Sequence, residues 1–181
     1  MHTLSKGQSG FTLIELVVVI VIIGILSVTA VPRYIDITEE AFISTTEGVA
    51  GAFRGGVNLG KAEYIVKHGN GTVPNLFETT DIDGNPLFIG SNEEGYPVAS
   101  DGVTVSLNTD LDCSDLWNGL INTSLIAGTN QLAPFSEKPD VISTLDDNDT
   151  GVCHYLMRDV GVDMQLTYDS NNGRVGLIRL N

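Results

Sequence analysis

The sequence predicts an α+β protein in which a long N-terminal helix packs on an antiparallel β-sheet. Three observations predict this fold. An apolar run over residues 11–30 could form a helix of about 30 Å. Apolar residues then recur at helical spacing as far as Lys67, and short strand-like segments separated by turn residues fill the rest of the 181-residue chain. The predicted helix therefore has two halves, 11–31 and 32–68, followed by a β-rich head over 69–181.

The first half is predicted to cross a membrane. Its sequence, FTLIELVVVIVIIGILSVTA, is rich in Val and Ile, but a single segment in lipid can satisfy its backbone hydrogen bonds only as a helix. Glu15 is the one charged residue in this apolar segment. An acidic group at the centre of a membrane helix costs on the order of 3 kcal/mol. Its position near the helix start, where the helix dipole favours negative charge, lowers this cost. Glu15 is thus either a tolerated interfacial residue or a functional group with a partner.

Residues 1–10, MHTLSKGQSG, are predicted to be a leader peptide. An ordinary secretory signal is cleaved after its apolar core, at a site of small residues. Here Pro32 follows the core where that site would be expected. Ser27, Thr29 and Ala30 leave ordinary cleavage as a weaker alternative.

The stretch from Gly10 to Leu16, followed by the aliphatic run and Pro32, resembles the class III signal of type IV pilins and pseudopilins. This resemblance implies that a prepilin peptidase cuts between Gly10 and Phe11 and methylates the new amine of Phe11. It further implies that Glu15 pairs with the amine of a neighbouring subunit and sets the register of assembly. Pairing within one chain, at i, i+4 spacing, is the alternative.

The second half of the helix is predicted to be amphipathic and to end near Lys67, because strong turn chemistry follows at residues 68–71. Its apolar face is formed by Ile35, Phe42, Val49, Phe53 and Val57. Pro32 is expected to kink the helix, with Gly24 as a second weak point.

Small residues in this half are predicted to lie close to one face. They are Gly48, Ala52, Gly55, Gly56 and Gly60. They either allow a sheet or a neighbouring helix to pack closely, or they fray the helix, since each glycine costs roughly 1 kcal/mol relative to alanine.

The head is predicted to contain a strand at 103–107, a short helix, and a C-terminal group of strands at 153–157, 164–168 and 175–180. The helix is expected to be capped within Asp112–Asp115. The core residues expected on this helix are Leu116, Trp117, Leu120 and Ile121.

Cys113 and Cys153 are 40 residues apart and lack the spacing of a zinc site. A disulfide is the simplest interpretation, and in the chain-entropy model it would contribute roughly 4 kcal/mol. Two separate free thiols are the alternative.

The formal charge of −14 argues against binding to nucleic acid. Asp146, Asp147 and Asp149 are weak candidates for a calcium site, although a solvated acidic loop is the better interpretation. The histidines are scattered, and the sequence contains no recognised catalytic motif. We therefore expect no catalytic residue, no metal and no cofactor, and a protein that is not an enzyme.

The size of the head, the Gly95-Tyr96-Pro97 element and the loop between the cysteines resemble the mannose-sensitive haemagglutinin (MSHA) type of pilin. This implies a pilus subunit that serves surface attachment, is inserted in the inner membrane as a precursor and ends in an extracellular filament. Its implied partners are identical subunits, the prepilin peptidase, the assembly machinery and the membrane. A type II secretion pseudopilin and a membrane-anchored binding protein that never polymerises are the alternatives.

Overall fold

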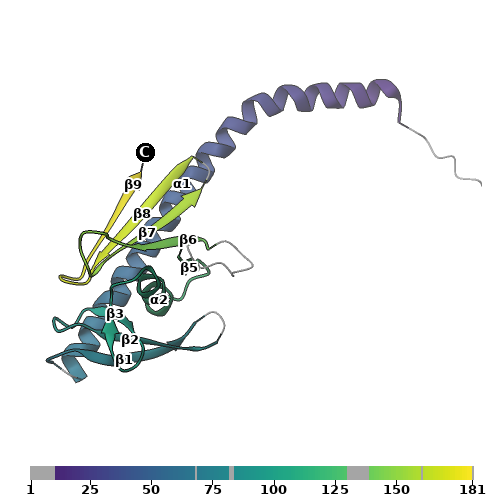
Figure 1. Cartoon of the computed structure of the whole chain (residues 1–181). Coiled ribbons are helices and arrows are strands. Elements are labelled where there is room, and N and C mark those ends of the chain that lie inside the picture. Colours follow the sequence, from purple (N-terminus) through teal and green to yellow (C-terminus); the bar gives the residue numbers. More distant parts are fainter. Residues whose placement is uncertain (1–10, 68, 82–83, 130–138, 160, 181) are drawn as a thin grey trace, which may run out of the picture. The chain divides into compact units, whose positions relative to one another are not determined.

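The computed structural model describes residues 11–67, 69–81, 84–129, 139–159 and 161–180, with the backbone alone for residues 29–36. The chain divides into two compact units, Met1–Glu40 and Ala41–Asn181. The described elements are a long helix, a short helix and two sheets, one antiparallel and one mainly antiparallel (Figure 1). The predicted α+β class, with an N-terminal helix packed on antiparallel sheet, is confirmed.

Helix α1 runs from Leu13 to Lys67 as one element of 55 residues. It ends where the turn sequence predicts, because Gly69 has a positive φ of 78° and its N–H donates to the Tyr64 carbonyl at 2.9 Å. This is a common way to end a helix. Gly24 and Pro32 both lie inside α1, and the kink expected at these residues stays a prediction.

The membrane-crossing span predicted over residues 11–31 is not supported. Among the residues that the structure describes, no helical stretch combines the length and the hydropathy needed to cross a bilayer.

The strands of the head divide between two sheets. The first contains β1 (Val73–Thr80), β2 (Pro86–Ser91), β3 (Pro97–Ser100) and β4 (Val105–Ser106) in that order, all antiparallel. The second contains β5 (Ala127–Gly128), β6 (Val141–Leu145), β7 (Val152–Asp159), β8 (Val162–Asp169) and β9 (Arg174–Leu180). Only β5 and β6 pair in parallel within this second sheet as described.

Strand β4 is shorter than predicted for residues 103–107. Asp101 accepts hydrogen bonds from the N–H groups of Val103 and Thr104 at 2.8 and 2.6 Å, and Gly102 has a positive φ of 85°. The carboxylate thus draws the first residues of the expected strand into a turn.

Helix α2 spans Asp110–Leu120 and begins earlier than predicted. Its N-cap is Thr109, whose hydroxyl accepts from the Asp112 N–H at 3.1 Å while Asp112 accepts from the Thr109 N–H at 3.1 Å. This reciprocal capping box replaces the cap expected within Asp112–Asp115. Leu116 and Trp117 are fully buried, as predicted for the apolar face of this helix.

The core of the head forms around Phe53, on the second half of α1. Its ring centroid lies 5.7 Å from that of Trp117 on α2, 5.4 Å from Tyr155 on β7 and 5.6 Å from Tyr168 on β8. All four side chains are fully buried. Aromatic pairs at such distances add stability beyond the area they bury. One helical residue therefore joins α1 to α2 and to the second sheet.

Contacts between the two sheets connect the turn between β2 and β3 to the hairpin formed by β8 and β9. The Asn92 side chain donates to the Ser170 carbonyl at 2.7 Å, and the Tyr168 hydroxyl donates to the Pro97 carbonyl at 2.8 Å. Gly173 has a positive φ of 71°, and a β-carbon there would overlap the ring of Tyr96. The C-terminal hairpin is thus fixed to the turn between β2 and β3.

Candidate functional site

The first turn of α1 holds the predicted processing and assembly residues. Gly10 and the leader 1–10 lie outside the described residues, whereas Phe11 is described and is 92% exposed. Thr12 precedes the helix. Its N–H and its hydroxyl both donate to Oε2 of Glu15, at 2.9 and 2.7 Å, and its Oγ1 accepts from the Glu15 N–H at 3.3 Å. Glu15 therefore closes a capping box at the start of α1.

Sequence reasoning missed Thr12. The signal that identifies it is the Thr-x-x-Glu spacing immediately before an apolar run, which is typical of a capping box. With Thr12 at the N-cap, the Glu15 carboxylate lies at the N-terminal end of the helix, where the dipole favours negative charge. Pairing of Glu15 with a freed Phe11 amine stays a prediction.

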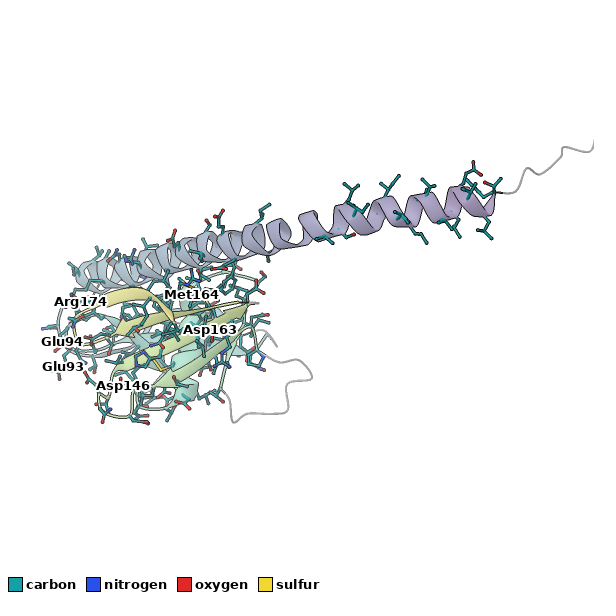
Figure 2. All side chains as sticks on the ribbon, turned by 90° about the horizontal axis from the view of Figure 1, so that it is seen from above. Glu93, Glu94, Asp146, Asp163, Met164 and Arg174 are labelled. Atoms are coloured by element: carbon teal, nitrogen blue, oxygen red, sulfur yellow. A yellow bond between two sulfur atoms is a disulfide. The ribbon has the colours of Figure 1, made fainter. Side chains whose placement is uncertain are left out.

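The first part of α1, from Leu13 to Val28, carries aliphatic side chains on all sides (Figure 2). Their exposed fractions run from 41% at Val17 to 79% at Leu13. Exposure of apolar surface to water costs about 25 cal/mol per Å², so a continuous run of this kind favours burial against another apolar partner. The aliphatic side chains exposed between residues 13 and 28 are Leu13, Ile14, Leu16, Val17, Val18, Val19, Ile20, Val21, Ile22, Ile23, Ile25, Leu26 and Val28.

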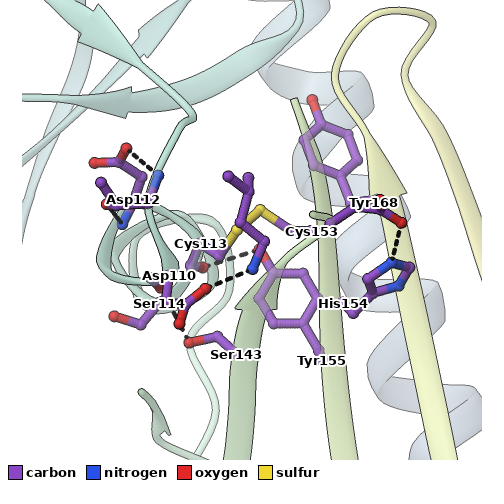
Figure 3. Close-up of a disulfide and its surroundings, with 12 residues drawn as sticks. Asp110, Asp112, Cys113, Ser114, Ser143, Cys153, His154, Tyr155 and Tyr168 are labelled. Carbon is purple, nitrogen blue, oxygen red and sulfur yellow. Dashed lines mark hydrogen bonds and ion pairs between the residues drawn. A yellow bond between two sulfur atoms is a disulfide. The ribbon is translucent and has the colours of Figure 1, made fainter. Parts of the chain in front are cut away.

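The predicted disulfide between Cys113 and Cys153 is present, and it links α2 to β7 (Figure 3). Both cysteines are fully buried, and the Tyr155 hydroxyl donates to the Cys113 carbonyl at 2.9 Å. On the same helix, Oδ1 of Asp110 accepts from the Leu145 N–H of β6 at 2.8 Å. The alternative of two free thiols was wrong.

In the acidic loop at residues 146–149, the Asp146 carboxylate bonds to groups of the chain itself. Asp146 accepts from the Asn148 N–H at 2.8 Å, and its Oδ2 lies 3.0 Å from Nε2 of His154. Hydrogen bonds from His154 and from the Asn148 N–H lower the pKa of Asp146. Across the described part of the chain, no group of three or more His, Cys, Asp or Glu side chains is placed to hold a metal ion. The weak calcium candidates Asp146, Asp147 and Asp149 gain no support.

Four of the small residues of α1, Gly48, Ala52, Gly55 and Gly56, line one groove, in agreement with the prediction that they lie close to one face. The space beside each glycine separates them: a β-carbon added at Gly56 would lie 2.8 Å from the Leu120 carbonyl oxygen, and one added at Gly60 would lie 2.5 Å from Cγ of Pro97. At Gly48 and Gly55 an added β-carbon would meet no atom within 4 Å. Gly56 and Gly60 thus allow the head to pack closely against α1, whereas Gly48 and Gly55 face open space.

Asp115, on α2, is a carboxyl with a raised pKa. Burial, with repulsion from Asp112 and Asp81, raises its pKa from an ordinary value of 3.8 to about 6. The folded protein therefore holds this proton more tightly than the unfolded chain does. The stabilisation from the protonated form is complete below pH 3.8 and is lost as the pH rises through about 6.

We expect Asp115→Asn to raise the free energy of unfolding at pH 7 by about 1 kcal/mol. The full pKa shift would give more, but the side chain is partly exposed and solvent reduces the effect. Urea denaturation between pH 4 and pH 8 measures it, with the exposed loop variant Asp147→Asn as the control. An unchanged dependence of stability on pH in Asp115→Asn would contradict the assignment.

Comparison with known proteins identifies the N-terminal segment. Residues 5–31 match the family model described as the prokaryotic N-terminal methylation motif. This match includes Gly10, Phe11 and Glu15.

Similarity to known proteins extends beyond that motif. A fimbrial protein of Neisseria meningitidis serogroup A is 41% identical over 88 residues, which is 46% of this chain and 48% of that protein. The type IV major pilin protein PilE1 of Neisseria gonorrhoeae is 34% identical over 114 residues, or 61% of this chain and 47% of that protein. The chain thus spans about half the length of these two Neisseria proteins.

A type IV narrow pilus major component of Thermus thermophilus, PilA5, is 33% identical over 110 residues, which cover 61% of this chain and 87% of that protein. No solved structure matches the chain. The names of these relatives are those of structural proteins, which confirms the prediction that the chain is not an enzyme.

Proposed function

The chain belongs to the type IV pilin family, and on that premise we propose that it is the structural subunit of a type IV pilus of the MSHA-like kind. The precursor is inserted in the inner membrane and is cleaved by a prepilin peptidase between Gly10 and Phe11. The new amine of Phe11 is methylated, and the assembly machinery adds the subunit to an extracellular homopolymer.

One observation carries this proposal. A helical segment with exposed aliphatic side chains on every side, residues 13–28, lies within the methylation motif matched over residues 5–31. Bundling such helices from identical subunits removes this apolar surface from water and requires no covalent link. Glu15 would then meet the methylated amine of a neighbouring subunit.

The head supports a role at the filament surface. One disulfide joins α2 to β7 of the second sheet, and such a bond suits the oxidising space outside the cytoplasm. The finer MSHA-like assignment rests on the Gly95-Tyr96-Pro97 turn and the region between Cys113 and Cys153. Surface attachment is the activity that we infer for this head.

Mass spectrometry of filaments sheared from cells tests the proposal. The expected result is an abundant N-terminal peptide that begins with methylated Phe11. A processed chain that is methylated but absent from the sheared fraction would favour a secretion pseudopilin. An unprocessed chain retained with the membrane would contradict assembly altogether.

A further inference from the structure

Three asparagines of the chain are followed directly by glycine: Asn70, Asn118 and Asn172. An asparagine in such a pair can react with its own backbone, because glycine has no side chain to hinder the approach of its nitrogen to the neighbouring carboxamide. The reaction needs a carboxamide that is able to turn and a glycine N–H that is not engaged in a hydrogen bond. The structure separates the three pairs by these requirements.

Asn118 lies in the last turn of α2, and its carboxamide is held on both sides. Its Oδ1 accepts from the Ala127 N–H and its Nδ2 donates to the Ala127 carbonyl, both at 3.2 Å. Gly119 lies within α2, where the backbone N–H groups bond to carbonyls of the helix itself. A β-carbon at Gly119 would lie 2.4 Å from Cδ1 of Ile89, so this pair is also tightly packed. The pair is therefore protected.

Asn172 is exposed, yet its carboxamide is held as firmly. Its Oδ1 accepts from the Arg174 N–H at 2.9 Å, and its Nδ2 donates to the Asp169 carboxylate. The Gly173 N–H donates to the Asp169 carbonyl at 2.8 Å. Reaction at this pair would first have to break these hydrogen bonds.

Asn70, in the turn between α1 and β1, has neither restraint. It is exposed, and within the described part of the chain neither its carboxamide nor the Gly71 N–H makes a hydrogen bond. A β-carbon added at Gly69 or Gly71 would meet no atom within 4 Å, so the space around this turn is open. The turn can therefore bring the Gly71 nitrogen onto Cγ of Asn70 without breaking a contact.

We propose that Asn70–Gly71 is a site of self-modification, at which the chain converts a side-chain amide into a carboxylate. The Gly71 nitrogen attacks Cγ of Asn70 and forms a C–N bond. The bond from Cγ to Nδ2 breaks, and ammonia leaves with the proton of the Gly71 N–H. Water then opens the cyclic imide at either of its carbonyls. The products are aspartate and isoaspartate, and the reaction needs no oxidant, reductant or protein partner.

The new carboxylate would lie just beyond the C-terminal end of α1. That end of a helix favours positive charge, and Lys67, the basic residue of the last turn, is already paired with Glu63. An added negative charge should therefore loosen the last turn of α1. Isoaspartate also lengthens the backbone by one carbon between α1 and β1. Older chains would thus differ from new ones where the long helix meets the first sheet.

Prolonged incubation of the purified full-length chain in detergent at mildly alkaline pH tests the proposal. Mass spectrometry of the three peptides measures the exchange of –NH2 for –OH at each asparagine. Conversion at Asn70 should be faster than at Asn118 or Asn172 by about tenfold or more, because hydrogen bonds at the other two pairs must break first. In urea with reductant all three pairs are released, so the excess at Asn70 should disappear. Equal rates in the folded chain, or the same ratio of rates with and without urea, would overturn the proposal.

Two variants test the role of the contacts. Asp169→Ala removes the carboxylate that holds the Asn172 side chain, so conversion at Asn172 should rise several-fold while Asn118 stays unchanged. Asn70→Gln is the matched control, because the longer side chain would have to close a larger ring and should remain unmodified. An unchanged rate at Asn172 in Asp169→Ala, or conversion of the glutamine at the rate of Asn70, would contradict the assignment.

Discussion

Replacing Glu15 by alanine is expected to abolish filaments while cleavage after Gly10 continues. In the proposed bundle of apolar helices, loss of the carboxylate would leave a methylated amine at Phe11 without a countercharge. An uncompensated buried charge costs about 3–5 kcal/mol, which lowers the affinity of each subunit at least about a hundredfold. The measurement is the amount of subunit in the sheared fraction beside the amount of processed subunit in the cell.

The capping box at Thr12 makes it possible to separate two roles of Glu15. Glu15→Gln keeps an oxygen that can accept from the Thr12 N–H and hydroxyl but removes the charge, so it should fail as Glu15→Ala does. Thr12→Ala keeps the charge and weakens the cap by about 1 kcal/mol, so its filaments should persist. Normal assembly of Glu15→Gln would show that the carboxylate acts only as a cap.

Removing the disulfide, by Cys113→Ala together with Cys153→Ala, is expected to lower the free energy of unfolding by roughly 4 kcal/mol. The bridge closes a loop with a sequence separation of 40 and joins α2 to β7 in the fully buried core. Alanine leaves no buried hydroxyl that would need a partner. Urea denaturation with and without reductant measures the effect, and reductant should lower the stability of the unmodified chain alone.

Tyr155→Phe is the control for this prediction, because it removes a hydrogen bond between the two elements, α2 and β7, that the disulfide also links. The Tyr155 hydroxyl donates to the Cys113 carbonyl at 2.9 Å. Its loss should cost about 1 kcal/mol. A disulfide variant no less stable than Tyr155→Phe would contradict a large contribution from the bridge.

The sequence predicted best those elements that local chemistry determines. The end of α1 at Lys67 followed from the turn residues beyond it, and β7 to β9 followed from alternating apolar residues around the turn that ends at Gly173. The methylation motif likewise depends on a short, contiguous set of residues. Its match to residues 5–31 agrees with the resemblance seen in the sequence.

Features that depend on pairing between distant residues were not predictable in the same way. The division of the strands into two sheets follows from which strands pair with one another, and no local pattern in the sequence specifies that pairing. Only Gly56 of the neighbouring pair Gly55 and Gly56 lies close to the head, because the two are rotated about 100° from each other around the helix. Strand β4 is short because the Asp101 carboxylate accepts hydrogen bonds from the Val103 and Thr104 N–H groups and so competes with strand pairing at the start of the expected strand.

The contacts of Phe53 have a mechanical consequence for a filament under tension. Part of any pull along the second half of α1 would reach the head through this residue, whose ring lies against Trp117, Tyr155 and Tyr168 on three different elements. The load is therefore distributed at once to a helix and two neighbouring strands, and the disulfide couples α2 to one of those strands. Extracting the helix would break all of these contacts together, so we expect the head to resist force as a unit.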